Sequence, residues 1–359
     1  MKGKVVVGLS GGVDSSVAAM LLKEQGYEVI GLFMRNWHEQ DEDGFCTAEE
    51  DFRDVRRVAD KLGIPYYVVD FSREYYDQVF AHFVEEYSKG RTPNPDVLCN
   101  REIKFEAFAR YARSFGADYI ATGHYAKCEV RDGIPYLMRA ADENKDQTYF
   151  LNQLRKDQLE NVLFPLADIT DKGLVRRLAA EAGLITAEKK DSTGICFIGE
   201  RNFRHFLSQY IPMREGDICT LDGKVVGRHE GVYYYTVGQR KGLGVGGGGN
   251  GEPYFVIRKD VEKNILWVNQ GECPLLYSRA LTVEKFNFIP KVLPDGEWRV
   301  SCRIRHRQPL QEATAYVEGS RVRVVFDTPQ RAVAEGQYAV LYRGRDCLGG
   351  GVIESKEGI

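Results

Sequence analysis

The sequence contains no long hydrophobic run. Among 359 residues, of which 43% are hydrophobic, no apolar stretch approaches the ~18 to 20 residues that a bilayer-spanning helix needs. The first four residues lead straight into a strand-like segment and lack the features of a signal or transit peptide. We therefore expect a cytoplasmic protein with no membrane partner, and the length predicts two or three domains.

Paired cysteines of the metal-binding kind are also absent. The eight cysteines stand at positions 46, 99, 128, 196, 219, 273, 302 and 347, with no C-x-x-C pair and no Cys/His spacing typical of zinc sites. A cytoplasmic chain of this length does not need disulfide bonds for stability. The pattern argues against a metal site, and most of these cysteines are expected to be small buried side chains.

A large excess of charge of either sign is missing as well. Lysine and arginine number 49 and aspartate and glutamate 52, so the net charge is −3, which excludes a protein that is basic over its whole surface. Residues 276–359 nevertheless carry 13 basic and 10 acidic residues. A nucleic-acid partner needs a local patch, and this C-terminal segment is one place to expect it.

Strand-like and helix-like segments alternate over residues 1–126, which predicts a doubly wound parallel sheet covered on both faces. The expected strands are 4–9, 27–34, 65–71 and 117–126. Helices are expected after residue 14, over 49–63, in a segment that ends near residue 88, and over 103–116. Between them, "GRTPNPDVLCN" at 90–100 contains two prolines and two asparagines, so it predicts a loop. Loops at the C-terminal edge of such sheets carry function.

The second half of the chain has a different pattern. A hairpin is expected over 128–138 with its turn at Asp132-Gly133, then helical segments to about 183 and a helix over 202–210. After Pro212 the hydrophobic period changes to 2 and turn signals recur, which predicts antiparallel β-structure. We therefore expect domains at 1–210, 211–275 and 276–359.

The segment "VVVGLSGGVDSS" places a glycine turn between a strand and a helix. Gly8 to Gly12 match G-x-S-x-G, a hydrolase nucleophile pattern, but only nine residues precede Ser10, and no earlier loop can supply an oxyanion donor. A Walker A loop is excluded because no Gly-Lys-Ser/Thr follows. The amides of Ser10, Gly11 and Gly12 can instead bind an anion at the start of a helix.

Asp14 extends this interpretation. Its carboxylate would repel a phosphate unless a cation lay between them, so a nucleotide with Mg²⁺ is implied. The alternative is a tight turn that Asp14 caps. A second glycine pattern, "GLGVGG" at 242–247, matches G-x-G-x-x-G but precedes "GGNGEP" rather than a helix, so it predicts a loop and not a dinucleotide site.

Eight stretches of sequence together carry a resemblance to a known family. They are "SGGVDSS", "GLFMRNW", "RTPNPDVLCNREIKF", "ATGHYA", "KDQTYFL", "DSTGICFIG", "YTVGQRKGLG" and "RIRHRQ". With these, the chain resembles the bacterial tRNA-specific 2-thiouridylases of the PP-loop ATP pyrophosphatase superfamily over nearly its whole length. The resemblance implies an α/β, adenine-nucleotide α-hydrolase-like N-terminal domain, a small central domain and a C-terminal antiparallel β-barrel that contacts tRNA. The glycine-rich "GVGGGGNGEP" departs from the family pattern.

The resemblance assigns site residues one at a time. The ATP loop comprises Gly8, Leu9, Ser10, Gly11, Gly12, Val13, Asp14 and Ser15, with Met34 on the adenine side and Gly123 as a further nucleotide contact. Asn94, Pro95 and Asp96 hold the target base. Asp96 also serves as a general acid or base, for which capping of the turn is the alternative role. Contacts with tRNA are assigned to His124, Lys145, Asp146, Gln147, Arg305, His306 and Gln337.

The implied reaction is ATP-dependent 2-thiolation of the wobble uridine of tRNA. AMP is transferred to the uracil 2-carbonyl oxygen, a persulfide on Cys196 supplies sulfur, and Cys99 attacks it to close a Cys99 to Cys196 disulfide. The implied partners are ATP with Mg²⁺, tRNA and a persulfide donor, which is a cysteine desulfurase or a sulfur relay protein. A monomer is expected. An iron–sulfur cluster held by Asp96, Cys99 and Cys196 is the alternative for the sulfur chemistry.

Two other functions stay open at this stage. One is an amidotransferase-type PP-loop ligase acting on a small metabolite, which the pair Cys99 and Cys196 and the basic β-segment disfavour. The other is a nucleotide-sensing RNA-binding protein without turnover. AMP formation that requires tRNA would separate the enzyme from the sensor.

Basic residues alternate with apolar ones in "RVSCRIRHR". On a strand, one face would hold Arg299, Ser301, Arg303, Arg305 and Arg307, and the other Val300, Cys302 and Ile304. Arg321 and Arg323 repeat the pattern. Such a face is either a solvated surface or a phosphate-binding one, and beside a domain that acts on RNA we expect phosphate binding.

Overall fold

A parallel sheet forms the centre of the N-terminal part. The computed structural model describes residues 2–37, 47–191, 203–246 and 251–359. The sheet has the order β3-β2-β1-β4-β7, and every pairing in it is parallel. Its strands are β1 (Lys4–Leu9), β2 (Glu28–Arg35), β3 (Tyr66–Asp70), β4 (Tyr119–Ala121) and β7 (Val162–Leu163).

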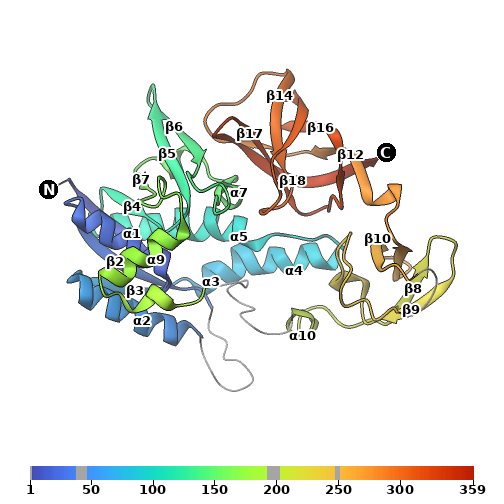
Figure 1. The fold of residues 1–359 in the computed structure, drawn as a ribbon, viewed down its shortest axis with the longest axis horizontal. Coiled ribbons are helices and arrows are strands. Elements are labelled where there is room, and N and C mark those ends of the chain that lie inside the picture. Colours follow the sequence, from blue (N-terminus) through green and yellow to red (C-terminus); the bar gives the residue numbers. More distant parts are fainter. Residues whose placement is uncertain (1, 38–46, 192–202, 247–250) are drawn as a thin grey trace.

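Helices cover both faces of this sheet. On β1, Val5 and Val7 face a core shared with α1 (Val13–Glu24), α2 (Thr47–Leu62) and α9 (Lys172–Glu181), whereas Val6 faces the opposite core. That opposite core contains residues of α3 (Ser72–Tyr75), η1 (Tyr76–Phe80), α4 (Ala81–Ser88) and α6 (Phe108–Ser114). The predicted doubly wound α/β fold is confirmed (Figure 1).

The segment predicted to be a loop over 90–100 contains a helix start. α5 (Pro95–Leu98) continues as the π-helical η2 (Cys99–Ala107) and then as α6. Asn94 is the N-cap, with its side-chain oxygen accepting from the Asp96 amide at 3.2 Å, and proline is favoured at the next position because it needs no backbone donor. The loop prediction is correct for residues 91–94 and wrong from Pro95 onward, because Asn94 and Pro95 mark a helix start.

A hairpin and several short elements link this sheet to the rest of the chain. β5 (Ala126–Arg131) and β6 (Ile134–Arg139) pair as predicted, and the turn residues Asp132 and Gly133 both have positive φ. After the hairpin come α7 (Thr148–Leu151), α8 (Lys156–Leu159), β7, α9 and the 3₁₀ turn η3 (Ile185–Glu188).

The central part is a small four-stranded sheet after α10 (Phe203–Ser208). Its order is β10-β11-β8-β9, formed by β8 (Gly216–Thr220), β9 (Val225–His229), β10 (Tyr254–Asp260) and β11 (Ile265–Gln270), with the 3₁₀ turns η4 (Val232–Tyr234) and η5 (Pro274–Leu276) beside it. β8 and β11 pair in parallel, and the other pairs are antiparallel. The expectation of antiparallel structure therefore holds for all but this pair.

The C-terminal part is a closed antiparallel barrel. Its strands are β12 (Tyr277–Val283), β14 (Gly296–Arg303), β15 (Gln311–Glu318), β16 (Arg321–Arg331), β17 (Tyr338–Arg343) and β18 (Asp346–Gly358), and the short β13 (Asn287–Phe288) pairs with β18. β12 pairs with both β16 and β18, which closes the barrel around its own core. Figure 1 shows the barrel above α4, with the central sheet beside it. Within the described ranges, no helix has the length and apolar character that crossing a membrane requires.

Candidate active site

The glycine turn after β1 is shaped by close contacts. Gly11 has a φ of +78°, and a Cβ on it would lie 2.7 Å from the carbonyl oxygen of Asp51, so both conformation and space require glycine. α1 begins at Val13 with Gly12 as its N-cap. Among the described residues, the amides of Gly11 and Gly12 have no protein acceptor. Both amides are therefore available to an anion at the start of the helix.

Ser10 differs from the expectation. Its amide donates to the Oγ of Ser15 at 3.1 Å, and the two Oγ atoms lie 3.2 Å apart. The Ser10 amide is thus satisfied within the turn, and its exposed hydroxyl is the group left to contact an anion. The prediction of three outward amides was wrong for Ser10, because the Ser15 side chain competes for that donor.

Two further predicted nucleotide residues pack against the turn. Gly123 follows β4 in the chain and packs against the start of α1. A Cβ on Gly123 would lie 2.7 Å from the amide nitrogen of Ser15. On β2, the terminal methyl of Met34 lies 3.3 Å from the position a Cβ of Gly8 would take. The structure therefore brings the glycine turn, Met34 and Gly123 together at the C-terminal edge of the sheet.

Asp14 is balanced by a protein cation. Its Oδ2 pairs with the Nζ of Lys172 at 2.6 Å, and its Oδ1 accepts a hydrogen bond from the Tyr125 hydroxyl at 2.8 Å. Burial, and then the charge of Asp14, raises the pKa of Tyr125, so that its hydroxyl stays protonated and donates. The inference that a metal cation must stand beside Asp14 was too narrow, because Lys172 supplies a counter-charge.

Lys172 belongs to a cationic cluster that the sequence analysis missed. Asp191 pairs with Arg176 at 2.9 Å, Lys172 at 3.0 Å and Lys145 at 3.4 Å. Burial alone would raise the pKa of Asp191, but the hydrogen bond from Lys172 and the charges of Lys145 and Arg176 lower it. The available signal was "DKGLVRR", in which Asp171 caps a helix whose first turns are basic. Three cations therefore stand beside the glycine turn.

Asp96 and Cys99 lie one helical turn apart at the start of the 95–114 helix. Cys99 is 1% exposed and is the first residue of η2, and π-helical turns are frequent at functional sites. Burial raises the pKa of Asp96, and the charge of Lys104 opposes this only in part. A carboxyl group with a raised pKa this close to a thiol fits acid–base chemistry.

The helix runs from Cys99 toward the glycine turn. A ring atom of Phe108 lies 3.8 Å from the Cβ position of Gly8. Phe108 is the first residue of α6 and directly follows η2, which begins at Cys99. Cys196 and Cys46 lie outside the described residues. The pairing of Cys99 with Cys196 therefore stays a prediction, as does the iron–sulfur alternative.

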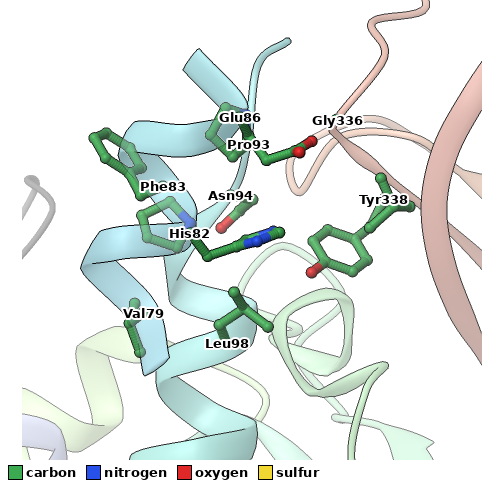
Figure 2. Close-up of a pocket in the computed structure, with 11 residues that line it drawn as sticks. Val79, His82, Phe83, Glu86, Pro93, Asn94, Leu98, Gly336 and Tyr338 are labelled. Atoms are coloured by element: carbon green, nitrogen blue, oxygen red, sulfur yellow. The ribbon is translucent and has the colours of Figure 1, made fainter. Parts of the chain in front are cut away.

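Asn94 borders a pocket between the N-terminal part and the barrel. In Figure 2, His82, Asn94 and Leu98 lie on the side of the N-terminal part and Gly336 and Tyr338 on the barrel side. Between the last two, Gln337 donates through Nε2 to the carbonyl oxygen of Thr92 at 2.7 Å. The barrel thus fixes the segment that leads into Asn94, Pro95 and Asp96.

His124 and Gln147 lie near the turn but are engaged by protein groups. The Nδ1 of His124 is 2.8 Å from the Thr122 hydroxyl, and its ring packs against Phe105. Burial lowers the pKa of His124 well below its usual value, so the ring is neutral. The side-chain oxygen of Gln147 accepts from the Tyr125 amide at 2.9 Å. Any contact of His124 with RNA would therefore use an uncharged imidazole.

The carboxylate of Asp146 is unavailable to RNA in this conformation. It is 1% exposed, pairs with Arg303 at 3.0 Å and accepts from the Thr148 hydroxyl at 2.9 Å. Arg139 lies 3.9 Å away. The Asp146 side chain thus joins the hairpin region to the barrel through its buried pair with Arg303, and its assignment as a tRNA contact stays a prediction.

Arg305 and His306 follow the end of β14. The guanidinium of Arg305 donates to the carbonyl oxygens of Ala332 at 3.0 Å and Val237 at 3.4 Å. The Nε2 of His306 lies 3.2 Å from the Asp146 carbonyl oxygen, and its ring centroid is 4.3 Å from that of Phe150. Both residues thus stand where the barrel meets the other two parts of the chain.

Only half of the predicted alternation on this strand is correct. Val300, Cys302 and Ile304 are buried in the barrel core as expected. The basic half does not form one phosphate-binding face, because carboxylates neutralise Arg299 and Arg303, whereas Arg305 lies beyond the end of β14 and contacts backbone carbonyls. The arginines of β16 are paired as well. Arg299 pairs with Asp327, Arg321 with Glu284, and Arg323 with Glu357. These pairs are partly exposed and stabilise little, but they cancel the positive face.

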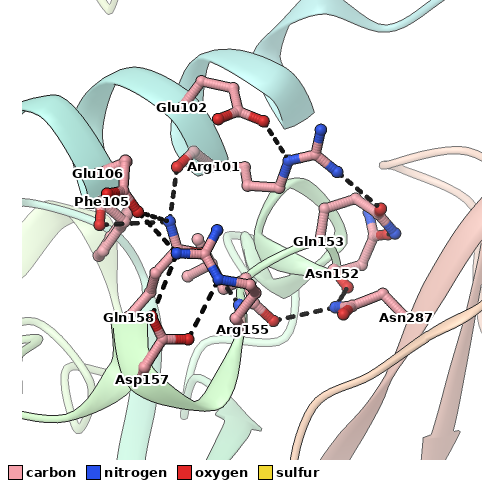
Figure 3. Close-up of polar contacts among 11 residues, drawn as sticks. Arg101, Glu102, Phe105, Glu106, Asn152, Gln153, Arg155, Asp157, Gln158 and Asn287 are labelled. Carbon is pink, nitrogen blue, oxygen red and sulfur yellow. Dashed lines mark hydrogen bonds and ion pairs between the residues drawn. The ribbon is translucent and has the colours of Figure 1, made fainter.

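A polar network ties the helix of Cys99 to the barrel (Figure 3). The amide of Gln158 donates to the carbonyl oxygens of Arg101 at 2.8 Å and Phe105 at 3.3 Å, which are groups of η2. Arg101 donates to Gln153, and Gln153 donates to the Gly350 carbonyl oxygen on β18. No pattern in the sequence predicts this network, because its members are ordinary polar residues far apart along the chain.

Three family models match successive parts of the chain. They are described as a tRNA methyl transferase HUP domain over residues 3–200, a tRNA methyl transferase PRC-barrel domain over 204–270 and an aminomethyltransferase beta-barrel domain over 278–353. The first model alone covers more than half of the chain.

Relatives match over almost the whole length. A tRNA-specific 2-thiouridylase of Alkaliphilus oremlandii is 57% identical over 98% of this chain and 97% of its own, and one of Bacillus subtilis is 57% identical over 98% and 95%. A crystal structure of a 4-thiouridine synthetase–RNA complex with bound ATP is 17% identical over 58% of this chain and 50% of its own, with a TM-score of 0.35, and adds nothing to the assignment. Because relatives 57% identical over 98% of the chain are tRNA-specific 2-thiouridylases, the chain belongs to the tRNA-specific 2-thiouridylase family.

Proposed function

We propose that this chain catalyses ATP-dependent 2-thiolation of the wobble uridine of tRNA at the C-terminal edge of its parallel sheet. The observation that supports this most is the arrangement of a phosphate-binding glycine turn below a helix that begins with Asp96 and Cys99. The family models carry methyl transferase descriptions, but the full-length relatives at 57% identity are 2-thiouridylases. Thiolation is therefore the better assignment.

The glycine turn would activate the substrate. The uracil 2-carbonyl carbon is a poor electrophile with no leaving group, and transfer of AMP to its oxygen corrects this. The amides of Gly11 and Gly12, the Ser10 hydroxyl and Lys172 are the groups that would stabilise charge on the departing pyrophosphate. Bound Mg²⁺, held near Asp14, would supply further charge neutralisation.

Sulfur transfer would then use two thiols. The terminal sulfur of a persulfide on Cys196 attacks C2 of the activated base, and AMP leaves. The Cys99 thiolate attacks the inner sulfur, breaks the sulfur–sulfur bond and forms the Cys99 to Cys196 disulfide, while 2-thiouridine departs. A thiol reductant restores both cysteines, and a persulfide donor protein reloads Cys196.

The remaining assignments complete the proposal. Residues 1–210 carry the chemistry, and residues 211–275 and 276–359 hold the tRNA. Met34 and Gly123 contact the nucleotide, and Asn94, Pro95 and Asp96 hold the base. The protein acts as a monomer in the cytoplasm, where it meets its tRNA and its sulfur donor.

One assay tests the whole proposal. Purified protein loaded with a persulfide is incubated with ATP, Mg²⁺ and tRNA transcript, and thiolated tRNA is detected by its retardation in a mercury-containing gel, with AMP measured in parallel. We expect retarded tRNA and an equal amount of AMP, both dependent on tRNA. AMP formation without tRNA would point to a ligase for a small molecule, and tRNA binding without AMP would point to a sensor.

The raised pKa of Asp96 predicts a pH dependence. If the carboxylate is the active form, kcat/KM falls as the pH is lowered through this pKa, which burial has moved above the usual aspartate value. The Asp96→Asn variant should lose this acidic limb together with most of its activity. Asp77→Asn is the matched control, because Asp77 is exposed and pairs only loosely with Arg73 at 4.0 Å. An Asp96→Asn profile identical in shape to that of the native protein would remove Asp96 from the chemistry.

A further inference from the structure

The motif "YTVGQRKGLG" forms a rigid loop next to the base-holding segment. The Gly238 amide donates to the Val256 carbonyl oxygen at 2.7 Å, and the Val256 amide donates to the Gln239 carbonyl oxygen at 3.0 Å, so β10 holds the loop in place. The hydroxyl oxygens of Thr236 and Thr92 lie 3.3 Å apart. Thr92 stands two residues before Asn94, so this loop of the central sheet borders the approach to the target base.

Five cations gather around this loop. Arg240 and Lys241 belong to it and are exposed. Lys259 donates to the Tyr235 carbonyl oxygen at 2.8 Å, and Arg305 donates to that of Val237. Lys356 donates to the carbonyl oxygen of Val333 at 3.0 Å. The adjacent Ala332 packs on Gly238 so closely that a Cβ on Gly238 would clash with the Ala332 side chain. We call Arg240, Lys241, Lys259, Arg305 and Lys356 the cationic rim.

The cationic rim is not neutralised by the protein. Over the ranges that the structure describes, none of its five members forms an ion pair with a carboxylate, whereas Arg299, Arg321 and Arg323 of the barrel all do. Burial lowers the pKa of Lys259 to about 8 and also lowers those of Arg305 and Lys356, and the nearby charge of Glu335 restores only part of this for the two lysines. Partly buried cations that lack a carboxylate partner are stabilised by a bound anion.

We propose that the cationic rim is a phosphate-binding surface for the sugar–phosphate backbone of the RNA whose base enters at Asn94. The inference rests on the proposed function for the identity of the RNA. A polyanion supplies several phosphates, which a group of cations on and around a rigid loop can contact without reading sequence. The surface therefore combines cations of the central domain with Arg305 and Lys356 of the C-terminal part, and does not follow the expected basic strand.

The test compares two double variants that change the net charge equally. Arg240→Ala/Lys241→Ala removes two rim cations, and Arg299→Ala/Arg323→Ala removes two arginines already paired in the barrel. The dissociation constant for tRNA is measured by filter binding at several salt concentrations, with ATP binding as a check on the catalytic domain. We expect about tenfold weaker tRNA binding for the rim variant and a salt slope lower by about 1.4 to 1.8, from 0.7 to 0.9 for each phosphate contact. The barrel variant should bind tRNA within twofold of the native protein.

Each other outcome has a definite meaning. A charge-retaining Arg240→Lys/Lys241→Arg variant should restore the affinity and the salt slope. If the rim variant binds tRNA as tightly as the native protein, and the native protein thiolates tRNA, the phosphate-binding role of the cationic rim is wrong and the proposed function stands. If that variant instead lost only loading of sulfur from a donor protein, the rim would be a surface for an acidic protein and the proposal would be wrong. Failure of the native protein to bind or thiolate tRNA would overturn the proposed function and the rim together.

Discussion

Replacement of Cys99 by alanine is expected to reduce tRNA thiolation by at least about a thousandfold, as removal of a catalytic nucleophile does. Without this thiol, nothing breaks the sulfur–sulfur bond that would join Cys196 to the base. The side chain is small and its backbone lies within the helix that runs on through η2 and α6, so we expect the variant to fold and to bind ATP and tRNA normally. Single-turnover thiolation with persulfide-loaded protein measures the effect without interference from reloading.

Cys128→Ala is the matched control for this experiment. Cys128 is half-buried on β5, and burial raises the pKa of its thiol to about 11, so it is a poor nucleophile at neutral pH. Its loss should leave the rate within about twofold. In the Cys99→Ala variant, AMP should still form once, and a base-linked protein adduct that a reductant releases should accumulate. Full thiolation by Cys99→Ala would mean that another group resolves the persulfide.

Local patterns in the sequence correctly predicted the structural features that depend on residues close together in the chain. The strand, glycine turn and helix of residues 4–24 follow from a run of valines, two adjacent glycines and an apolar helix. The hairpin turn at Asp132 and Gly133 follows from the preference of these residues for positive φ. The burial of Val300, Cys302 and Ile304 follows from alternation. Each of these features is decided within a few residues of chain.

The errors concern charged residues whose partners are distant in sequence. Arg303 is 157 residues from Asp146, yet the two form a buried pair that neutralises Arg303. Lys172 is 158 residues from Asp14 and supplies a counter-charge that local sequence could not reveal. A charge pattern along one segment shows where cations lie, but the facing strands and loops decide which of them are neutralised. Asn94 and Pro95 are a different case, since their local signal for a helix start was available and was interpreted as a loop.

Replacement of Gly123 by alanine is expected to weaken ATP binding by at least about tenfold. The added Cβ would lie 2.7 Å from the amide nitrogen of Ser15 and 2.8 Å from the carbonyl carbon of Asp14. These are backbone atoms at the start of α1, so the clash cannot be relieved by rotating a side chain, and the glycine turn must shift. Overpacking of this kind costs about 1 to 3 kcal/mol of the free energy of unfolding. Because the phosphate-binding amides of Gly11 and Gly12 precede the displaced residues directly, the nucleotide site should lose more than the fold.

Titration calorimetry with ATP and urea unfolding measure the two effects separately. Gly358→Ala is the control, because a Cβ at Gly358 would meet no atom within 4 Å and its φ is one that alanine adopts readily. That variant should match the native protein in both measurements. A Gly123→Ala protein that is destabilised yet binds ATP with native affinity would show that Gly123 serves packing alone. The nucleotide would then have to lie away from the turn, since a shift of backbone at Asp14 and Ser15 cannot leave a phosphate bound there undisturbed.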